Sequence, residues 1–126
     1  MFAADPKTDV EGAYAAWDGA FNKGDAKSIA AAYLPNAKLL PPVDEIASGQ
    51  AAIEKFYAGA LANGITDHKL EVIDAGGDGK IVYSTARWSA KGTDKEGKPA
   101  TFSGFATYVF ERQTDNSLKL LLQTWN

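Results

Sequence analysis

The first half of the chain places hydrophobic residues three or four positions apart, which is the spacing of an amphipathic helix. In the first such stretch, Thr8 and Asp9 are suitable helix N-caps, and Lys23-Gly24 is a typical helix end. The apolar stripe between them consists of Val10, Tyr14, Trp17 and Phe21. The chain is therefore expected to begin with an amphipathic helix that buries an aromatic face.

Two further helices are predicted in this half. Asp25 is a good N-cap for a short second helix, and Pro35 ends it because proline cannot continue a helix. Residues 37–40 predict a short strand, which stops at Pro41-Pro42 because these nitrogens carry no hydrogen for a strand ladder. Ser48 is the expected N-cap of the third helix. The buried stripe of that helix consists of Ala52, Ile53, Phe56, Tyr57, Ala60 and Leu61.

The second half changes to the two-residue alternation of β-strands. Turns rich in glycine and polar residues separate four expected strands, around residues 68–72, 81–90, 101–111 and 118–125. Three helices followed by hairpin-connected strands predict an α+β domain, with the helices packed on a curved antiparallel sheet. We expect a single domain over residues 1–126, with residues 1–7 as a flexible N-terminus.

The composition narrows the possible chemistry. With 45% hydrophobic and 23% charged residues, the chain is typical of a globular domain. It contains no cysteine and a single histidine, His68. These counts exclude disulfide frameworks, thiol nucleophiles, cysteine zinc sites and any site that needs two histidines. We expect no metal and no cofactor, since the sequence carries no metal-binding or phosphate-loop motif.

The charge pattern narrows the possible partners. The net charge is −3 and acidic and basic residues are interspersed, whereas a nucleic-acid surface needs clustered basic residues. There is no apolar run of about 18 residues, so no membrane span is expected. We expect a cytoplasmic protein. The alternative is a periplasmic or secreted protein, if Met1-Phe2-Ala3-Ala4 is the remnant of a removed signal peptide.

Three segments resemble sequence motifs of one superfamily. They are residues 17–25 (WDGAFNKGD), 48–57 (SGQAAIEKFY) and 123–126 (QTWN). In order and separation they resemble the NTF2-like superfamily, in particular its SnoaL-like, DUF4440 and ketosteroid isomerase-like branches. The resemblance covers essentially the whole chain. It implies a cone-shaped, cystatin-like α+β barrel with a deep pocket, commonly a homodimer through the outer face of the sheet.

The resemblance to ketosteroid isomerases does not extend to their catalytic groups. In that family, a tyrosine on the first helix and a protonated aspartic acid on a late strand bind the substrate oxygen, and a second aspartate moves the proton. The corresponding positions in this chain are Trp17, Ala106 and Pro41. An indole N–H can donate a hydrogen bond. The side chains of alanine and proline can neither donate a hydrogen bond to the substrate oxygen nor transfer a proton. This chain therefore lacks the tyrosine and the two aspartates on which the enolisation mechanism of that family depends.

The implied pocket is expected to be apolar with a few polar groups. We expect it to be lined by Trp17, Phe21, Phe56, Tyr57, His68, Ser84 and Trp88. The alternative for each aromatic ring is plain core packing. A phenol that reaches the pocket could orient a ligand oxygen, and Tyr14 and Tyr57 are candidates for this role. Arg87 alternates with Trp88 along its strand, so it is expected to point outward, towards a dimer face or solvent.

The catalytic residues are unknown from the sequence, and two weak candidates remain. His68 shares strand parity with Leu70 and Val72, so it is expected to face inward, where histidine is a suitable general base if a partner orients it. Asp44 follows Pro41-Pro42 near the expected pocket mouth and could replace the missing base. The alternatives are a structurally bonded histidine and a solvated loop carboxylate.

Three functions stay open. The first is an isomerase, cyclase or hydratase that acts on a hydrophobic carbonyl compound. The second is a non-catalytic module that binds a hydrophobic small molecule in the same cavity. The third is a dimeric association domain that fills its cavity with its own side chains. A cavity that touches His68 or Asp44 would favour the enzyme, and a cavity lined only by carbon would favour the binding module.

Overall fold

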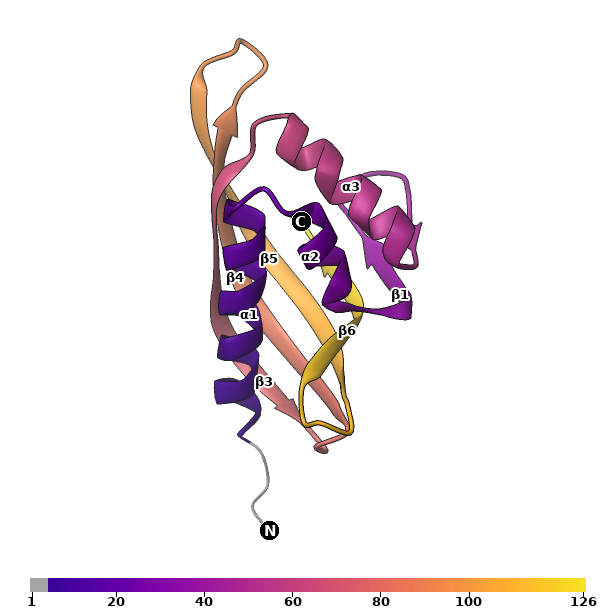
Figure 1. Cartoon of the computed structure of the whole chain (residues 1–126). Helices are drawn as coiled ribbons and strands as arrows, with labels where there is room; N and C mark the ends of the chain where they lie inside the picture. The colour runs from indigo at the N-terminus through magenta and orange to yellow at the C-terminus, as the bar shows by residue number, and fades with distance from the viewer. Residues whose placement is uncertain (1–4) are drawn as a thin grey trace.

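Three helices lie on one face of a curved six-stranded sheet in the computed structural model, which describes residues 5–126 (Figure 1). The elements in chain order are α1 (Pro6–Asn22), α2 (Ala26–Ala31), β1 (Tyr33–Leu40), β2 (Ala47–Ser48), α3 (Gln50–Ala62), β3 (Thr66–Gly77), β4 (Ile81–Thr93), β5 (Pro99–Arg112) and β6 (Leu118–Trp125). The α+β class and the order of its elements agree with the prediction. Within residues 5–126, no helix has both the length and the hydrophobicity to cross a bilayer. The segment Met1-Phe2-Ala3-Ala4, on which the signal-peptide alternative depends, lies outside the described residues.

The strand order is β2-β1-β6-β5-β4-β3, so β2 and β3 are the two edges of an open sheet. The four long strands pair as the expected antiparallel hairpins. The prediction of an antiparallel sheet is wrong for β1, which runs parallel to β6 from the Tyr33–Leu120 pair to the Leu40–Thr124 pair. The sheet is therefore mixed. Because the two partners are far apart in the chain, local alternation of residues carries no signal for this pairing.

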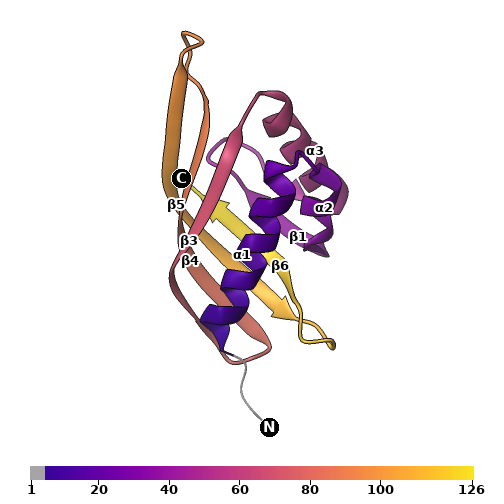
Figure 2. The same ribbon diagram turned by 60° about the vertical axis from the view of Figure 1, so that its left-hand side comes forward.

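The sheet is curved, and its concave face and the helices enclose a common interior. The register shifts between Val72 and Asp74 in β3 and between Val109 and Phe110 in β5, and such bulges increase the local twist of a sheet. By contrast, β4 and β5 pair without a shift from Ile81 to Thr93. Figure 2 shows α1 and α3 on the same side of this long hairpin. The interior between them holds the core and the candidate site.

α1 begins earlier than the sequence predicts. Asp5 is the N-cap in place of Thr8 or Asp9: its carboxylate accepts a backbone N–H at 3.1 Å and the Thr8 hydroxyl at 2.9 Å. Pro6 stands at the first helical position, where an N–H would have no helical partner in any case. Of the N-terminus expected to be flexible, residues 1–7, the last two are thus helical.

Two other boundaries differ because strand pairing overrides the local signal. Asp25 caps the second helix as expected, but Tyr33 is not helical: it pairs with Leu120 of β6 and starts β1. Ser48 is not the N-cap of α3, because it is paired in β2. Gly49 takes that position with φ 85°, in the left-handed region that favours glycine.

The core fills the interior between the helices and the sheet. α3 contributes Ile53 and Tyr57, and the strands contribute every second residue. Each large apolar side chain contributes about 1.5–3 kcal/mol when it is fully buried. The small inward-facing residues Ala90 and Ala106 leave space beneath the helices. The predicted stripe of α1 is at most 5% exposed along its whole length: Val10, Tyr14, Trp17 and Phe21.

Candidate functional site

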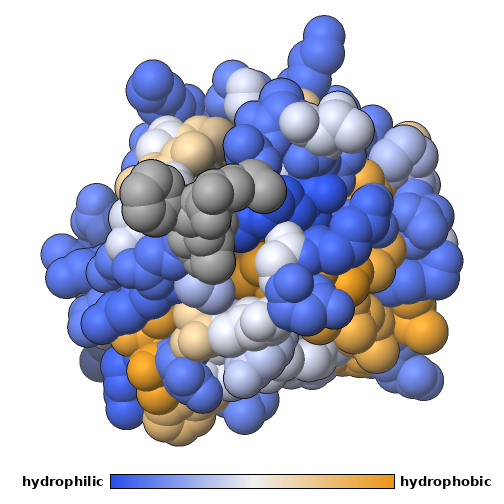
Figure 3. All heavy atoms as spheres, turned by 90° about the horizontal axis from the view of Figure 1, so that it is seen from below, coloured by the Kyte–Doolittle hydropathy of each residue, from blue (hydrophilic) through white to orange (hydrophobic). Residues whose placement is uncertain are grey.

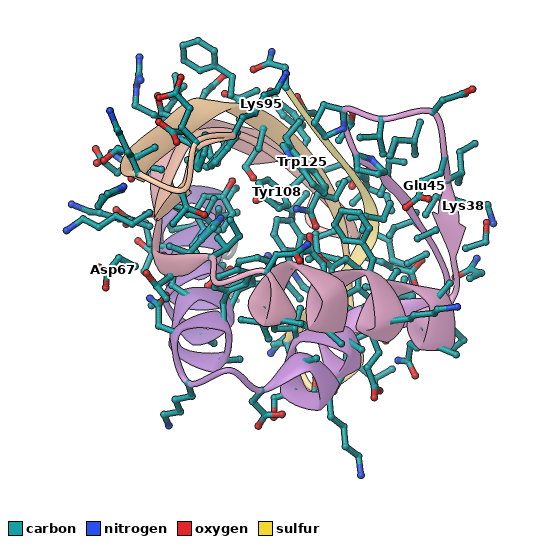
Figure 4. All side chains as sticks on the ribbon, turned by 90° about the horizontal axis from the view of Figure 1, so that it is seen from above. Lys38, Glu45, Asp67, Lys95, Tyr108 and Trp125 are labelled. Carbon is teal, nitrogen blue, oxygen red and sulfur yellow. The ribbon has the colours of Figure 1, made fainter. Side chains whose placement is uncertain are left out.

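A cavity of about 180 Å³ lies between α1, α3 and the inner face of the sheet. Its wall is largely aromatic and aliphatic, and the polar groups in it are few. Figure 4 looks into the fold from above and shows Tyr108 and Trp125 directed into the space between the sheet and α3. Such a wall favours an apolar small molecule that a few polar groups hold in place.

Most of the residues that the sequence predicts for a pocket come together around this cavity. Six of the seven predicted residues are among those that line it: Trp17, Phe21, Phe56, Tyr57, His68 and Trp88. Ser84 is fully buried, but it lies outside the lining and bonds to the hydroxyl of Tyr14. The hydroxyl of Tyr14 is therefore engaged away from this cavity. Asp44 is exposed in the loop between β1 and β2 and does not line the cavity.

His68 lines the cavity from β3, and α1 holds it in place. Its Nδ1 lies 2.8 Å from Oδ1 of Asp18, whose other oxygen accepts the backbone N–H of Leu70 at 2.9 Å. Four residues further along α1, the Asn22 amide makes two hydrogen bonds to the backbone of His68, at 2.8 and 2.9 Å. Side chain and backbone of the histidine are thus fixed by one helix face.

The imidazole is packed between aromatic rings. It lies parallel to the indole of Trp88, with ring centroids 6.2 Å apart, and contacts Trp17 and Phe21 at 4.8 and 5.0 Å. The side chains of His68 and Asp18 are only 12% and 18% exposed. When the carboxylate accepts the hydrogen of Nδ1, the neutral ring keeps its lone pair on Nε2. Nε2 has no hydrogen-bond partner within residues 5–126, so it is available to a ligand.

A second group of polar side chains forms a chain of hydrogen bonds inside the core. Nε1 of Trp17 donates to the Tyr33 hydroxyl at 3.2 Å, and Tyr33 donates to Oε1 of Gln123. The hydroxyls of Tyr33 and Tyr57 lie 3.4 Å apart, and Nε2 of Gln123 lies 3.5 Å from the hydroxyl of Tyr108. Three members of this chain also line the cavity: Tyr57, Tyr108 and Gln123.

Burial sets the protonation state of these phenols. It raises the pKa of Tyr33, Tyr57 and Tyr108 well above the ordinary value near 10, because the charged form loses its hydration. Neighbouring phenols raise the pKa of Tyr57 and Tyr108 further. At neutral pH these groups are therefore hydrogen-bond donors and not bases.

A second cavity of about 280 Å³ lies on the other side of Trp17 and Tyr108, under α1 and α2. Its wall combines alanines of α1 with aromatic residues and leucines from the sheet, among them Ala13, Ala16, Ala20, Phe110 and Leu120. Trp17 and Tyr108 line both cavities and form the partition between them.

The outer face of the sheet exposes apolar residues. Tyr83, Val109 and Leu122 form one cross-strand row, and Tyr83 and Leu122 are 46% and 37% exposed. Phe105 is 51% exposed, and the guanidinium of Arg87 lies 5.0 Å from its ring centroid. The expected outward direction of Arg87 is confirmed. Figure 3 views the end at which α1 begins and shows hydrophobic patches that interrupt a mostly hydrophilic surface.

Three residues of this site were not predicted from the sequence: Asp18, Tyr108 and Gln123. Asp18 follows Trp17 directly and so lies at the edge of the buried stripe, where helical periodicity expects a solvated side chain. Tyr108 shares strand parity with the buried Phe110, and Gln123 is the polar residue at an inward position of β6. The alternation of inward and outward side chains along β5 and β6 could therefore have predicted Tyr108 and Gln123 as inward-facing. Within residues 5–126, no three histidine, aspartate or glutamate side chains come together as a possible metal site.

Comparison with known proteins places this geometry among related folds. The family model of the SnoaL-like domain matches residues 11–115. A ketosteroid isomerase-like protein from Erwinia carotovora atroseptica has a TM-score of 0.81 at 16% identity, covering 94% of this chain and 92% of its own. Aln2 from a Streptomyces species also has a TM-score of 0.81 at 16% identity, covering 99% and 94%.

A third similar structure is an NTF2-like protein with a cystatin-like fold from Novosphingobium aromaticivorans. Its TM-score is 0.78 at 13% identity, covering 95% of this chain and 80% of its own. No curated protein sequence matches the chain significantly. At these identities the structural similarities define the fold, which is the NTF2-like, cystatin-like fold that the sequence motifs predict.

Proposed function

The chain belongs to the SnoaL-like domain family, and from this premise we propose that it is an enzyme of isomerase or cyclase type that moves a proton on an apolar carbonyl compound. The cavity supplies the apolar surroundings and His68 supplies the base. The observation that carries the proposal is the His68–Asp18 pair at the cavity wall, with Nδ1 and Oδ1 2.8 Å apart. A wall of carbon alone would support a binding module instead.

The proposed step is a proton transfer from carbon. Nε2 of neutral His68 takes a proton from the carbon next to the ligand carbonyl, and the C–H electron pair becomes the double bond of an enolate. Asp18 stabilises the imidazolium that forms and keeps the ring in the tautomer that leaves Nε2 free. In a ligand with a double bond between the β- and γ-carbons, the enolate is conjugated, and return of the proton to the γ-carbon gives isomerisation. Attack by the enolate carbon on a second carbonyl of the same molecule gives cyclisation, and the imidazolium returns its proton to the alkoxide that forms.

This step differs from the one that the resemblance to ketosteroid isomerases implies. The indole N–H of Trp17 already donates to Tyr33, so it is not free for a ligand oxygen. Ala106 lines the cavity with a methyl group. The base therefore comes from β3 and the orienting carboxylate from α1.

The second part of the proposal is a homodimer through the outer face of the sheet. The exposed row of Tyr83, Val109 and Leu122, with Phe105 beside it, gives that face an apolar surface of the kind that marks protein interfaces. The cavity lies on the opposite, helix-covered side of the sheet, so a dimer through the outer face does not cover it.

Deuterium exchange tests the proton transfer. The probe is α-tetralone, an apolar bicyclic ketone, and proton NMR in D2O follows the loss of hydrogen next to its carbonyl. We expect the protein to accelerate exchange and His68→Gln to lower that acceleration by about 100-fold or more. Lys69→Gln, at the exposed neighbouring position, is the matched control. Binding without exchange would favour the binding module, and no binding would favour the association domain.

A further inference from the structure

We infer that the hydroxyl of Tyr108 donates the hydrogen bond that holds the ligand oxygen at the inner end of the cavity. This inference rests on the proposed function, since it assigns the group that receives the oxygen of an apolar carbonyl ligand. It also predicts the orientation of that ligand, with its oxygen inward at Tyr108 and its proton-donating carbon towards His68. Each buried phenol has one hydroxyl hydrogen to donate, so a phenol that already donates inside the protein cannot donate to a ligand.

The hydrogen of Tyr33 is already used. Its hydroxyl has the amide oxygen of Gln123 as its nearest acceptor. The same Tyr33 oxygen accepts the indole N–H of Trp17 at 3.2 Å. The remaining contact of this oxygen is the hydroxyl of Tyr57 at 3.4 Å. We assign the hydrogen of this contact to Tyr57, because the single hydrogen of Tyr33 goes to the closer acceptor on Gln123. The hydroxyl hydrogens of Tyr33 and Tyr57 thus both have acceptors inside the protein, on Gln123 and on Tyr33.

The hydrogen of Tyr108 is different. Its oxygen accepts from Nε2 of Gln123 at 3.5 Å, at the long limit of a hydrogen bond. Within residues 5–126, no acceptor receives the hydrogen of this hydroxyl. Tyr108 is 2% exposed and lines the aromatic cavity, so this hydrogen is directed to a molecule inside that cavity and not to bulk solvent. A buried donor without an acceptor is unfavourable, and a ligand oxygen would remove that penalty.

Two features keep Tyr108 a donor. Burial and the neighbouring phenols raise its pKa well above 10, so the hydroxyl stays protonated at neutral pH. Its ring is fixed by Tyr14 and Phe110, with ring centroids 5.1 and 6.1 Å away. The donor is therefore held in position before a ligand arrives, which is the condition for selective stabilisation of charge on an enolate oxygen.

The inner placement of Tyr108 determines the orientation of the ligand. Tyr108 lines the partition to the second cavity, whereas His68 on the edge strand β3 is partly exposed. A ligand whose oxygen bonds to Tyr108 therefore turns the carbon next to its carbonyl towards the imidazole, and the rest of its skeleton lies against the aromatic walls. Apolar molecules that lack an oxygen would bind without this fixed orientation.

The test compares α-tetralone with tetralin, the same bicyclic skeleton without the carbonyl. Infrared spectroscopy of α-tetralone labelled with carbon-13 at the carbonyl should show a shift of the C=O stretch to lower frequency on binding. Tyr108→Phe should abolish this shift and lower the affinity for α-tetralone by about two- to tenfold, the effect of one hydrogen bond. The affinity for tetralin should stay within about twofold, which also verifies that the variant is folded with its cavity intact.

Tyr14→Phe is the matched control. It also removes a buried phenol hydroxyl, but that hydroxyl bonds to Ser84 and lies outside the aromatic cavity. It should leave the infrared shift unchanged. A shift that persists in Tyr108→Phe would overturn the inference.

The third variant, Tyr57→Phe, tests the rival donor. If this variant abolishes the shift and Tyr108→Phe does not, the amide of Gln123 has the opposite orientation and Tyr57 is the donor, which overturns the inference. If exchange at carbon depends on His68 while no phenol affects the shift, the inference fails and the proposed function stands. If neither probe binds, both fail.

Discussion

Asp18 connects α1 to β3 through both of its carboxylate oxygens. One oxygen lies 2.8 Å from Nδ1 of His68, and the other accepts the backbone N–H of Leu70 at 2.9 Å. A ring flip of the imidazole would break the first contact while the second holds the carboxylate in place. The direction of Nε2 is therefore set by the packing of a core helix on an edge strand.

Asp18→Asn should impair proton transfer more than it impairs binding. The amide cannot accept at both positions, so one of the two N–H groups loses its acceptor and the imidazole loses its negatively charged partner. We expect exchange of α-tetralone to fall about 10- to 100-fold, with its affinity within about twofold. The free energy of unfolding should fall by about 1–3 kcal/mol. NMR exchange and urea denaturation measure the two effects.

The matched control for this variant is Asp9→Asn. Asp9 lies on the same helix, and its carboxylate bonds to the Arg112 guanidinium at 3.0 Å, away from the cavity. We expect Asp9→Asn to lower the free energy of unfolding without changing the rate of deuterium exchange of α-tetralone. An equal loss of exchange in both variants would show a general effect of helix α1 and contradict the assigned role of Asp18.

Gly104→Ala should displace the last residue of the chain from the sheet. A Cβ at this position would clash with the backbone oxygen of Asn126, which accepts the indole N–H of Trp88 at 3.1 Å. We expect a lower melting temperature and a changed tryptophan emission spectrum, because the indole of Trp88 loses its acceptor.

Gly12→Ala is the control for that substitution. Gly12 lies within α1 with no neighbouring atom within 4 Å of an added Cβ, so alanine should stabilise the helix by about 0.5–1 kcal/mol. A melting temperature in Gly104→Ala that equals or exceeds that of the unsubstituted protein would contradict the predicted clash.

The outer face of the sheet predicts a dimer that charge can disrupt. Light scattering at micromolar concentration should give about twice 13.4 kDa. The double variant Tyr83→Glu, Leu122→Glu puts two carboxylates into the exposed apolar row and should yield a monomer with an unchanged circular dichroism spectrum. Ile46→Glu, 63% exposed in the loop before β2, should leave the mass unchanged. A monomer before any substitution would argue against this interface.

Alkaline pH should destabilise the fold through its buried phenols. Burial raises the pKa of Tyr14 to about 12 and that of Tyr33, Tyr57 and Tyr108 in the same direction. Below pH 10 the stabilising effect of the neutral phenols is fully present. Above it the unfolded chain releases protons that the folded chain retains. Stability should then fall by about 1.4 kcal/mol per pH unit for each such tyrosine, until the pH reaches the pKa in the folded protein.

Absorbance at 295 nm and circular dichroism against pH measure this effect together. We expect the buried tyrosines to ionise only with the cooperative loss of structure. The Tyr83→Phe variant removes the signal of the exposed tyrosine, so the remaining change reports the buried ones. Ionisation of these groups near pH 10 with an unchanged dichroism spectrum would disprove the prediction.

The sequence was sufficient where a feature depends on local periodicity. The helical spacing of Val10, Tyr14, Trp17 and Phe21 predicted the buried face of α1, and the bounds of β6 were predicted to the residue. It was insufficient where distant segments meet. Nothing near Tyr33 indicates that Leu120 will pair with it, so the second helix was predicted too long.

In the candidate site, too, local periodicity predicted some residues, whereas contacts between distant segments could not be predicted. Aromatic residues at inward positions predicted part of the cavity wall, because parity and helical period determine which way a side chain points. The partner of His68 could not be predicted, since a contact across 50 residues leaves no periodic trace. Asp44 was selected for its place in a loop near the expected pocket mouth, which does not show whether its side chain reaches the cavity. Nothing in the sequence around Ser84 shows that its hydroxyl bonds to Tyr14.

The parallel pairing of β1 with β6 also affects how the protein folds during synthesis. The ribosome makes all helices and five of the strands before Leu118 emerges, yet β6 lies in the sheet between β1 and β5. Until then, β1 and β5 lack their shared neighbour and Gln123 is absent from the buried hydrogen bonds. Contacts of such high sequence separation make folding slow. A nascent chain that has not yet released β6 therefore lacks one wall of the future cavity, which makes it a candidate client of chaperones that bind exposed hydrophobic segments.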